Sequence, residues 1–168
     1  VRWVKNLVTL NNLRGIHEPF NYSRKIIGFD TFSGFENVSE KDGTHEIIKK
    51  GAFSVTDDYD KYLEEILDYH EKECPVSHVK KNTLIKGDAV VMLEKYLKEH
   101  PETIIAFAYF DFDVYEPTKK CLELIKPYLT KGSIIGFDEL NDPQFPGETV
   151  ALKETLGLNN IAVKRSKY

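Results

Sequence analysis

Residues 103–113 read Thr-Ile-Ile-Ala-Phe-Ala-Tyr-Phe-Asp-Phe-Asp, which is the most apolar stretch of the chain followed at once by two acids. An apolar run of this length without polar alternation is typical of a strand that is buried on both faces of a parallel sheet. Asp111 and Asp113 would then lie at the carboxyl end of the strand, the edge at which open α/β sheets bind ligands. We therefore expect a central strand that carries acids to a binding edge.

Three further segments repeat this pattern of a short strand with a polar end. Residues 25–30 end in Asp30, residues 82–86 turn into Gly87-Asp88, and residues 133–137 end in Asp138-Glu139. Apolar residues at helical spacing separate these strands and predict helices, which in chain order cover residues 1–10, 57–74, 89–100, 117–129 and 148–156. This alternation predicts an α/β fold with a doubly wound, Rossmann-like, mostly parallel sheet.

The remaining segments are predicted from their turn and cap residues. Residues 11–24 contain Asn, Gly and Pro and indicate a loop, and Lys131-Gly132 indicates a turn into the strand at 133–137. Thr56 and Asp88 are expected to cap the helices that follow them. Residues 160–165 predict a last strand. Residues 36–55 are polar and weakly periodic, and we interpret them as a lid over a site.

Composition indicates one globular domain over residues 1–168. Of its residues, 41% are hydrophobic and 30% are charged, which allows one sizeable core. The net charge is −4 and the basic residues are scattered, so no nucleic-acid partner is expected. The longest apolar run, residues 104–110, is too short to span a membrane, and no secretory segment opens the chain, so we expect a cytoplasmic protein. Cys74 and Cys121 lack metal-site spacing and predict buried free thiols.

The four acids Asp111, Asp113, Asp138 and Glu139 follow two of the expected strands. One reading is that they cap helices, and for Asp88 we prefer that reading. For the four acids it explains less, because each helix needs only one cap. Several carboxylates at one sheet edge repel each other unless a cation compensates them, so the four predict a site for a hard divalent cation.

Three motifs occur in a fixed order along the chain. They read Phe29-Asp-Thr-Phe-Ser-Gly-Phe35, Asp111-Phe-Asp-Val-Tyr-Glu-Pro-Thr118 and Leu129-Thr-Lys-Gly-Ser-Ile-Ile-Gly-Phe-Asp138-Glu139. Together they resemble the macrocin O-methyltransferase family of S-adenosylmethionine-dependent enzymes, and the resemblance covers most of residues 25–155. It implies a class I methyltransferase sheet.

The resemblance also implies roles for individual residues. Asp30, with Thr31 and Phe32, would contact the ribose end of S-adenosylmethionine, and the turn at Gly87 and Asp88 would lie by the adenine. The metal-binding acids of the family match Asp111, Asp138 and Glu139, with Mg²⁺ as the expected ion. Asp113 matches the second acid of the same motif, as a supporting ligand or a base, so Asp111 and Asp113 are the candidate catalytic residues.

The family's sheet has a strand and a glycine-containing cofactor loop that would precede Val1. The only methionine is Met92, so we expect the chain to begin inside a larger product. The absent strand would lie between the strands that end at Asp30 and Asp111. We therefore expect that these two strands do not pair directly and that this chain alone does not form a complete cofactor site.

These observations favour a metal-assisted O-methyltransferase that acts on a hydroxyl of a sugar or another small molecule. A bound cation would lower the pKa of that hydroxyl. Two alternatives remain open: a glycosyltransferase whose Asp111-Phe112-Asp113 holds a metal and a nucleotide sugar, and a non-catalytic module. Acceptor specificity is expected in residues 36–55 and 140–147, with His45 as the one histidine placed to meet substrate. Phe32 and Tyr115 are expected to line the pocket. The sequence leaves the oligomeric state open, a homo-oligomer included.

Overall fold

The computed structural model describes residues 5–165 of the chain. They form two compact units. Unit 1 combines residues up to Gly34 with Phe53–Met92, and unit 2 combines Phe35–Ala52 with the residues from Leu93 onward. Each unit contains its own pair of parallel strands and its own helices, and each is described by itself.

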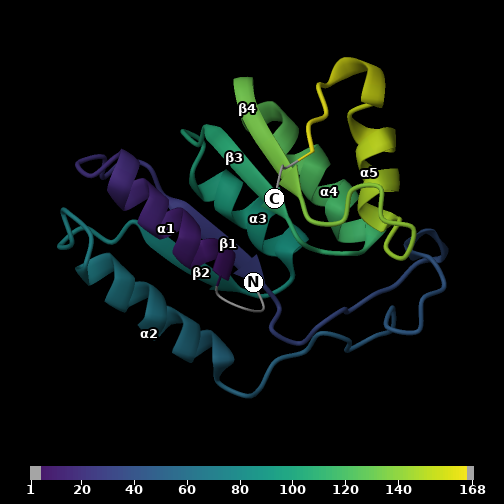
Figure 1. The fold of residues 1–168 in the computed structure, drawn as a ribbon, viewed down its shortest axis with the longest axis horizontal. Helices are drawn as coiled ribbons and strands as arrows, with labels where there is room; N and C mark the ends of the chain where they lie inside the picture. Colours follow the sequence, from purple (N-terminus) through teal and green to yellow (C-terminus); the bar gives the residue numbers. More distant parts are fainter. Residues whose placement is uncertain (1–4, 166–168) are drawn as a thin grey trace. The chain divides into compact units, whose positions relative to one another are not determined.

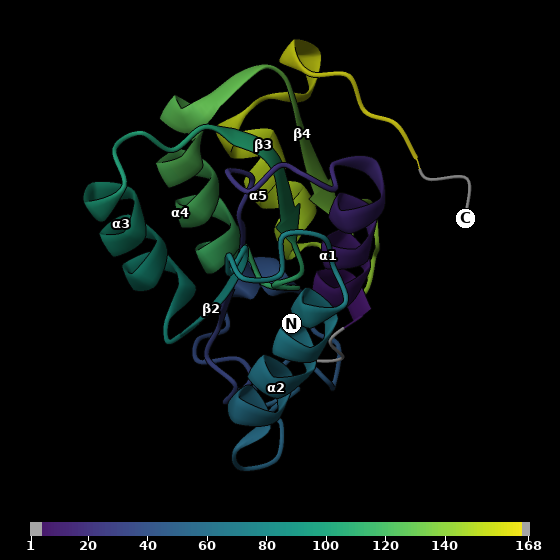
Figure 2. The ribbon, with the colours of Figure 1, turned by 90° about the vertical axis from the view of Figure 1, so that its left-hand side faces the viewer.

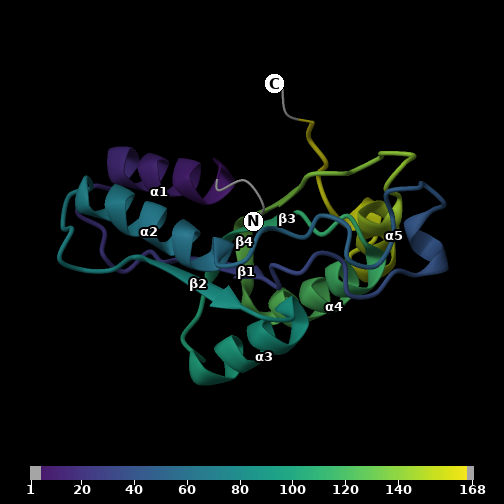
Figure 3. The ribbon, with the colours of Figure 1, turned by 90° about the horizontal axis from the view of Figure 1, so that it is seen from below.

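Unit 1 is built on strands β1 (Ile26–Asp30) and β2 (Asn82–Lys86), which pair in parallel from Ile26 opposite Asn82 to Asp30 opposite Lys86. Helices α1 (Lys5–His17) and α2 (Tyr59–Lys72) contact these strands and lie side by side (Figures 1 and 3). Leu63 and Leu67 of α2 are buried in this packing. A Cβ at Gly28 would lie 3.1 Å from a methyl carbon of Leu7, so glycine allows α1 to approach β1 closely.

A buried polar network joins the helices of unit 1 to β2. The Glu71 carboxylate on α2 accepts hydrogen bonds from Arg14 on α1 (3.2 Å) and from the side chain of Asn82 (2.8 Å), and it forms an ion pair with Lys81 (2.5 Å). The Lys81 ammonium group also donates to the carbonyl oxygens of Val76 and Val79, both at 2.8 Å. All four side chains of the network are buried. Two cations therefore share one carboxylate away from water.

The prediction of a loop over residues 11–24 is wrong for residues 11–17, which belong to α1, and this network explains why. Helix α1 continues to His17 because Asn11 and Arg14 on one of its faces are buried, and the side chain of Arg14 donates to that of Asn11 at 3.0 Å. Two asparagines and Gly15 made this segment resemble a loop. The tertiary contacts outweigh those local preferences.

Unit 2 is built on strands β3 (Ile105–Phe110) and β4 (Leu129–Phe137), which also pair in parallel. Helices α4 (Tyr115–Ile125) and α5 (Gly147–Thr155) pack against each other (Figure 2). Short 3₁₀ turns occur at Glu40–Asp42, Lys126–Tyr128 and Leu158–Asn160. The buried apolar side chains of this unit are Leu93, Leu97, Phe110, Val114, Tyr115, Cys121, Leu122, Ile125, Ala151 and Leu152.

Helix α3 (Ala89–Glu99) begins in unit 1, and the division between the units passes through it. The carboxylate of Asp88 accepts a hydrogen bond from the backbone N–H of Val91 at 2.9 Å. The prediction that Asp88 caps this helix is therefore confirmed. The Thr56 prediction is wrong, because the residue before α2 is Asp58, which has a left-handed backbone (φ 60°) and makes no side-chain cap bond.

Two strand predictions in unit 2 need correction. Lys131-Gly132 is not a turn before a strand but lies inside β4, where the pairing is irregular between Ile105 and Phe107. There the Ser133 hydroxyl donates to the Ile105 carbonyl oxygen at 2.6 Å and replaces a regular ladder bond. Residues 160–165 form no strand; after the 3₁₀ turn they are irregular.

The strand pairing agrees with the predicted fold class. Within residues 5–165, β1 pairs only with β2 and β3 only with β4, so the strands ending at Asp30 and Asp111 are not direct partners, as expected. Both pairs are parallel. Both cysteines are free thiols, Cys121 buried and Cys74 half-buried. No helix of the described chain is both long and apolar enough to cross a membrane.

The middle of segment 36–55 is attached to unit 2. The buried carboxylate of Asp42 accepts hydrogen bonds from the backbone N–H of Tyr115, at the start of α4, and from the backbone N–H and hydroxyl of Ser39. The Lys41 ammonium group donates to Glu154 on α5 at 2.6 Å. Residues 39–42 are thus bonded to α4 and α5.

Gly147 is the position where this attachment leaves no room for a side chain. A Cβ there would lie 2.5 Å from Asp42 Oδ1 and 2.7 Å from the backbone nitrogen of Tyr115. We expect Gly147→Ala to lower the free energy of unfolding by about 2–3 kcal/mol, since both neighbours are held in place. Urea unfolding measures the change. The penalty should shrink in an Asp42→Ala background without disappearing, because the Tyr115 nitrogen remains. An equal penalty in both backgrounds would contradict the clash with Asp42.

Candidate functional site

The residues expected to bind cofactor lie together at the carboxyl end of the β1–β2 pair in unit 1. The backbone N–H of Gly87 donates to the Asp30 carbonyl oxygen at 2.9 Å, which brings the turn after β2 to the end of β1. The Asp30 carboxylate accepts the backbone N–H of Phe32 at 2.7 Å. The hydroxyl of Thr31 donates to the Gly34 carbonyl oxygen at 3.2 Å and closes the turn. One sheet edge therefore carries Asp30, Thr31, Phe32, Gly87 and Asp88.

The backbone at this edge is unusual in two places. Phe32 has φ 62° and Gly87 has φ 140°. Positive φ is rare for a bulky residue, and at Gly87 it is combined with a close approach to Met92, 3.0 Å from where a Cβ would stand. The Phe32 ring lies 6.4 Å from that of Tyr59, and burial together with Tyr62 and Asp30 raises the pKa of Tyr59.

The acids of unit 2 lie together at the carboxyl ends of β3 and β4. Phe110 and Phe137 are paired in register, and the backbone N–H of Asp138 donates to the Phe110 carbonyl oxygen at 3.1 Å. Asp111 and Asp138 thus follow adjacent strand ends. Asp113 has a left-handed backbone (φ 60°), which turns the chain sharply before α4. The expectation that these acids come from separate stretches to one edge is met within unit 2.

Burial and mutual repulsion perturb these carboxyl groups. Burial, followed by the charges of Asp111, Glu139 and Asp138, raises the pKa of Asp113 to about 7. Burial and then Asp138 are the main causes that raise the pKa of Glu139. Each group therefore holds its proton to a higher pH, because it is buried and because negative charge is concentrated nearby. A cation or a proton at this edge would relieve that cost.

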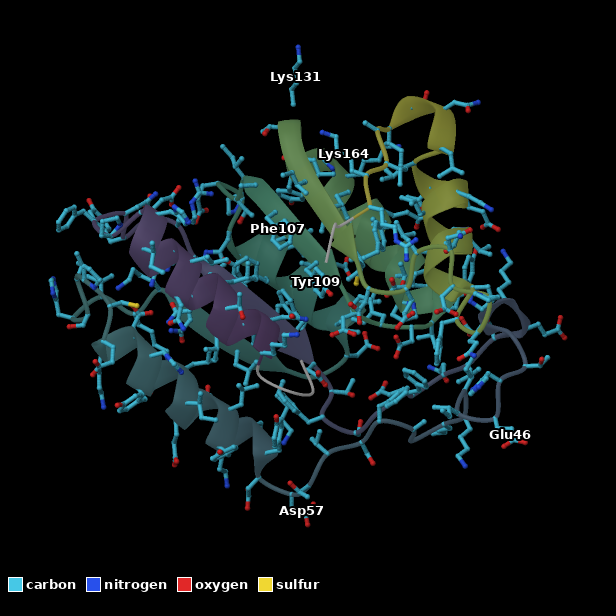
Figure 4. The ribbon with its side chains drawn as sticks, viewed as in Figure 1. Glu46, Asp57, Phe107, Tyr109, Lys131 and Lys164 are labelled. Atoms are coloured by element: carbon cyan, nitrogen blue, oxygen red, sulfur yellow. The ribbon has the colours of Figure 1, made fainter. Side chains whose placement is uncertain are left out.

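Tyr109 lies in the strand that the sequence predicts to be buried on both faces, yet it contacts one of the candidate acids. Its phenol group donates to Asp138 Oδ1 at 2.6 Å, and its side chain is 39% exposed. It lies beside Phe107 on one face of β3 (Figure 4), with ring centroids 6.3 Å apart. Burial and the bond to Asp138 raise the pKa of Tyr109, so the phenol stays protonated and donates. Its position in an apolar run concealed this role.

Glu148 is a second residue that sequence reasoning missed. It stands in the first turn of α5 and its side chain is fully buried. Its carboxylate accepts the backbone N–H groups of Phe112 (2.9 Å), Asp113 (3.3 Å) and Glu139 (3.4 Å). Burial raises its pKa to about 7, against the effect of these donors. An acid near a helix start is common, so no sequence signal distinguished it.

The raised pKa of Glu148 makes stability depend on pH. A carboxyl group with a pKa near 4.5 unfolded and about 7 folded binds more protons in the folded state, so stability falls as pH rises through that interval. We expect a loss of about 3 kcal/mol from this group. Urea unfolding from pH 4.5 to pH 8 should show a clearly weaker decline in Glu148→Gln, and an unchanged decline would contradict the assignment.

The expected metal ligands have the right chemical type for a divalent cation, but their side chains are not arranged around one ion position. Carboxylate oxygens are the ligands that Mg²⁺ prefers, and Asp111, Asp138 and Glu139 supply them from adjacent strand ends. Across residues 5–165, however, no three His, Cys, Asp or Glu side chains stand close enough to hold one ion together. Binding would require these side chains to turn toward each other.

Tyr115 does not line a pocket, contrary to the prediction. Its side chain is 4% exposed, and its hydroxyl donates to Glu154 and accepts from Lys41 and Lys119, both at 2.9 Å. The two ammonium groups lie near its ring. These donors lower the pKa of Glu154 to about 2. The Tyr115 side chain therefore links Lys41 to α4 and α5 through hydrogen bonds.

A shallow hollow of about 320 Å³ lies between the two segments expected to set acceptor specificity. It is lined by Thr44, His45, Glu46, Pro143 and Gln144. The His45 ring lies 5.9 Å from that of Phe145, and its Nδ1 accepts the backbone N–H of Ile47 at 3.3 Å. Nε2 is then the protonated nitrogen and a hydrogen-bond donor. The structure thus joins segments 36–55 and 140–147 at one surface.

Comparisons with known proteins give a close structural match. The crystal structure of CalS11, a calicheamicin methyltransferase, shows 46% sequence identity to this chain. It superposes on 96% of this chain with a TM-score of 0.93. An apo structure of CalS11, titled a TDP-rhamnose 3'-O-methyltransferase of calicheamicin biosynthesis, is 42% identical, with a TM-score of 0.82 over 97% of this chain. The chain spans 63% and 62% of those two chains. No family model and no curated protein matches it. The fold is therefore that of a Rossmann-like methyltransferase.

Proposed function

We propose that the protein is an S-adenosylmethionine-dependent O-methyltransferase that methylates a hydroxyl group of a sugar. The observation that carries this proposal is the 46% identity and TM-score of 0.93 to a calicheamicin methyltransferase over 96% of the chain. The three motifs at Phe29–Phe35, Asp111–Thr118 and Leu129–Glu139 support a finer placement with the macrocin O-methyltransferases.

In this proposal the edge of unit 1 binds the methyl donor. Asp30 would accept hydrogen bonds from the ribose hydroxyls, with Thr31 and Phe32 beside it and Gly87 and Asp88 near the adenine. The short turn after β1 and its bond to Gly87 support that role, because they hold the Asp30 carboxylate at a strand end. Asp88 also caps α3, so its backbone is the more suitable contact.

The edge of unit 2 would hold Mg²⁺ and the acceptor. Asp111, Asp138 and Glu139 are the proposed ligands. Burial and then neighbouring negative charge raise the pKa of Asp113 and of Glu139, and the contribution of that charge supports a compensating cation. A bound Mg²⁺ would lower the pKa of an acceptor hydroxyl. Asp113 follows the proposed ligand Asp111 by two residues, so its carboxylate would be the base that accepts the hydroxyl proton. Methyl transfer then requires alignment of oxygen, methyl carbon and sulfur.

Calorimetry with the larger product, within which this chain is expected to lie, tests the proposal. We expect S-adenosylhomocysteine to bind, and methyl transfer from S-adenosylmethionine to TDP-rhamnose, used as a probe acceptor, to be detected by mass spectrometry. The Asp111-Phe112-Asp113 sequence also suits a glycosyltransferase, which would bind a nucleoside diphosphate with metal instead. Tight binding of the nucleotide without binding of S-adenosylhomocysteine would overturn the proposal.

A further inference from the structure

We propose that Glu148 is a positioning residue that holds the ends of β3 and β4 in the relative position the acids need. The inference deepens the proposed function and rests on it. Glu148 lies outside all three sequence motifs, nine residues after Glu139. It is assigned from its contacts alone.

The bonds of Glu148 go to the strand ends rather than to its own helix. One carboxylate oxygen accepts the N–H groups of Phe112 and Asp113, immediately after β3, and the other accepts the N–H of Glu139, immediately after β4. A first-turn acid that served only its helix would accept from N–H groups of that helix. Glu148 instead bridges two segments 26 or more positions apart in sequence (113 to 139).

These bonds fix the backbone at the residues that carry the acids. Asp113 and Glu139 are themselves donors to Glu148, and Phe112 separates Asp111 from Asp113. The orientation of a peptide unit sets the direction of the adjoining Cα–Cβ bonds. Glu148 holds these three peptide groups, so it determines the direction in which the neighbouring acidic side chains leave the backbone. It does so without touching a reacting atom.

The helix that carries Glu148 is held independently. Ala151 and Leu152 of α5 are fully buried against the rest of unit 2, and Gly147 packs on Asp42 and Tyr115. Changing the Glu148 carboxylate thus leaves the apolar anchoring of α5 in place. This separation allows a positioning role to be tested apart from a purely structural one.

The test compares Glu148→Gln and Glu148→Met. Gln keeps one acceptor oxygen for Phe112 and Asp113 but presents an NH₂ group to Glu139, whereas Met has similar length and no acceptor. We expect kcat for methyl transfer to fall about 10-fold in Glu148→Gln and about 100-fold in Glu148→Met, with the KM for S-adenosylmethionine unchanged. Lys153→Met, an exposed change on the same helix, is the control and should leave kcat unchanged.

A second readout does not depend on activity. Hydrogen exchange followed by NMR should show fast exchange of the Glu139 amide in Glu148→Gln, and of all three amides in Glu148→Met. If the amides lose protection while kcat stays at the wild-type value, or if they stay protected in Glu148→Met, the positioning role is overturned. If the wild type transfers no methyl group but the exchange pattern holds, the proposed function fails while the contacts of Glu148 stand.

Discussion

Replacing Asp138 by Asn is expected to reduce magnesium-dependent methyl transfer by about three orders of magnitude, which corresponds to about 4 kcal/mol of lost transition-state stabilisation. Asp138 follows the strand residue that pairs with Phe110, and it is the acid to which Tyr109 donates. Asn retains a carbonyl oxygen for that phenol but loses the charge that a divalent cation requires. The affinity for S-adenosylhomocysteine should change little, because Asp138 is not among the residues proposed to bind it.

Two further variants distinguish the effect of the Asp138 charge from the effect of the hydrogen bond that orients Asp138. Glu116→Gln removes a half-exposed carboxylate of α4 that pairs with Lys120, and it should have a small effect on turnover. Tyr109→Phe removes the hydrogen bond to Asp138 and leaves the ring, and a decrease of about 10-fold is expected. Steady-state rates with and without a chelator provide the measurement. Full activity of Asp138→Asn, or wild-type turnover in excess chelator, would exclude the metal-assisted mechanism.

Replacing Glu71 by Ala is expected to lower the free energy of unfolding by about 3–5 kcal/mol. Lys81 and Arg14 are both buried, and Glu71 is the only carboxylate that bonds to them among the described residues. Its removal leaves two buried cations without a neutralising carboxylate and creates a cavity. The network already has two buried nitrogens without a protein partner, Asn11 Nδ2 and Arg14 Nε, so it has little capacity to reorganise.

Asp68→Ala on the same helix is the matched control. Asp68 pairs with Lys80 at 3.1 Å, and both side chains are about half exposed. An exposed pair of this kind contributes from nothing to about 1 kcal/mol. Urea unfolding of both variants provides the comparison. Similar small losses for Glu71→Ala and Asp68→Ala would mean that water reaches the Arg14–Glu71–Lys81 network.

The sequence predicted most elements because their signals are local. The strands at 26–30, 82–86 and 105–110 and the helix at 147–155 follow from apolar runs and from helical spacing. The errors have a common cause in contacts over long range. Helix α1 continues through asparagines because Glu71 lies opposite, and β4 includes Lys131-Gly132 because Ser133 bonds to Ile105.

The candidate site shows the same division. The sequence alone determined that acids follow parallel strands, since strand polarity places every carboxyl end at one edge of its sheet. Only the tertiary structure decided how those acids are supported: the phenol of Tyr109, the buried carboxylate of Glu148 and the bond from Tyr115 to Asp42 each join residues more than 25 positions apart. Such contacts leave no periodic signal, because they depend on which faces pack together.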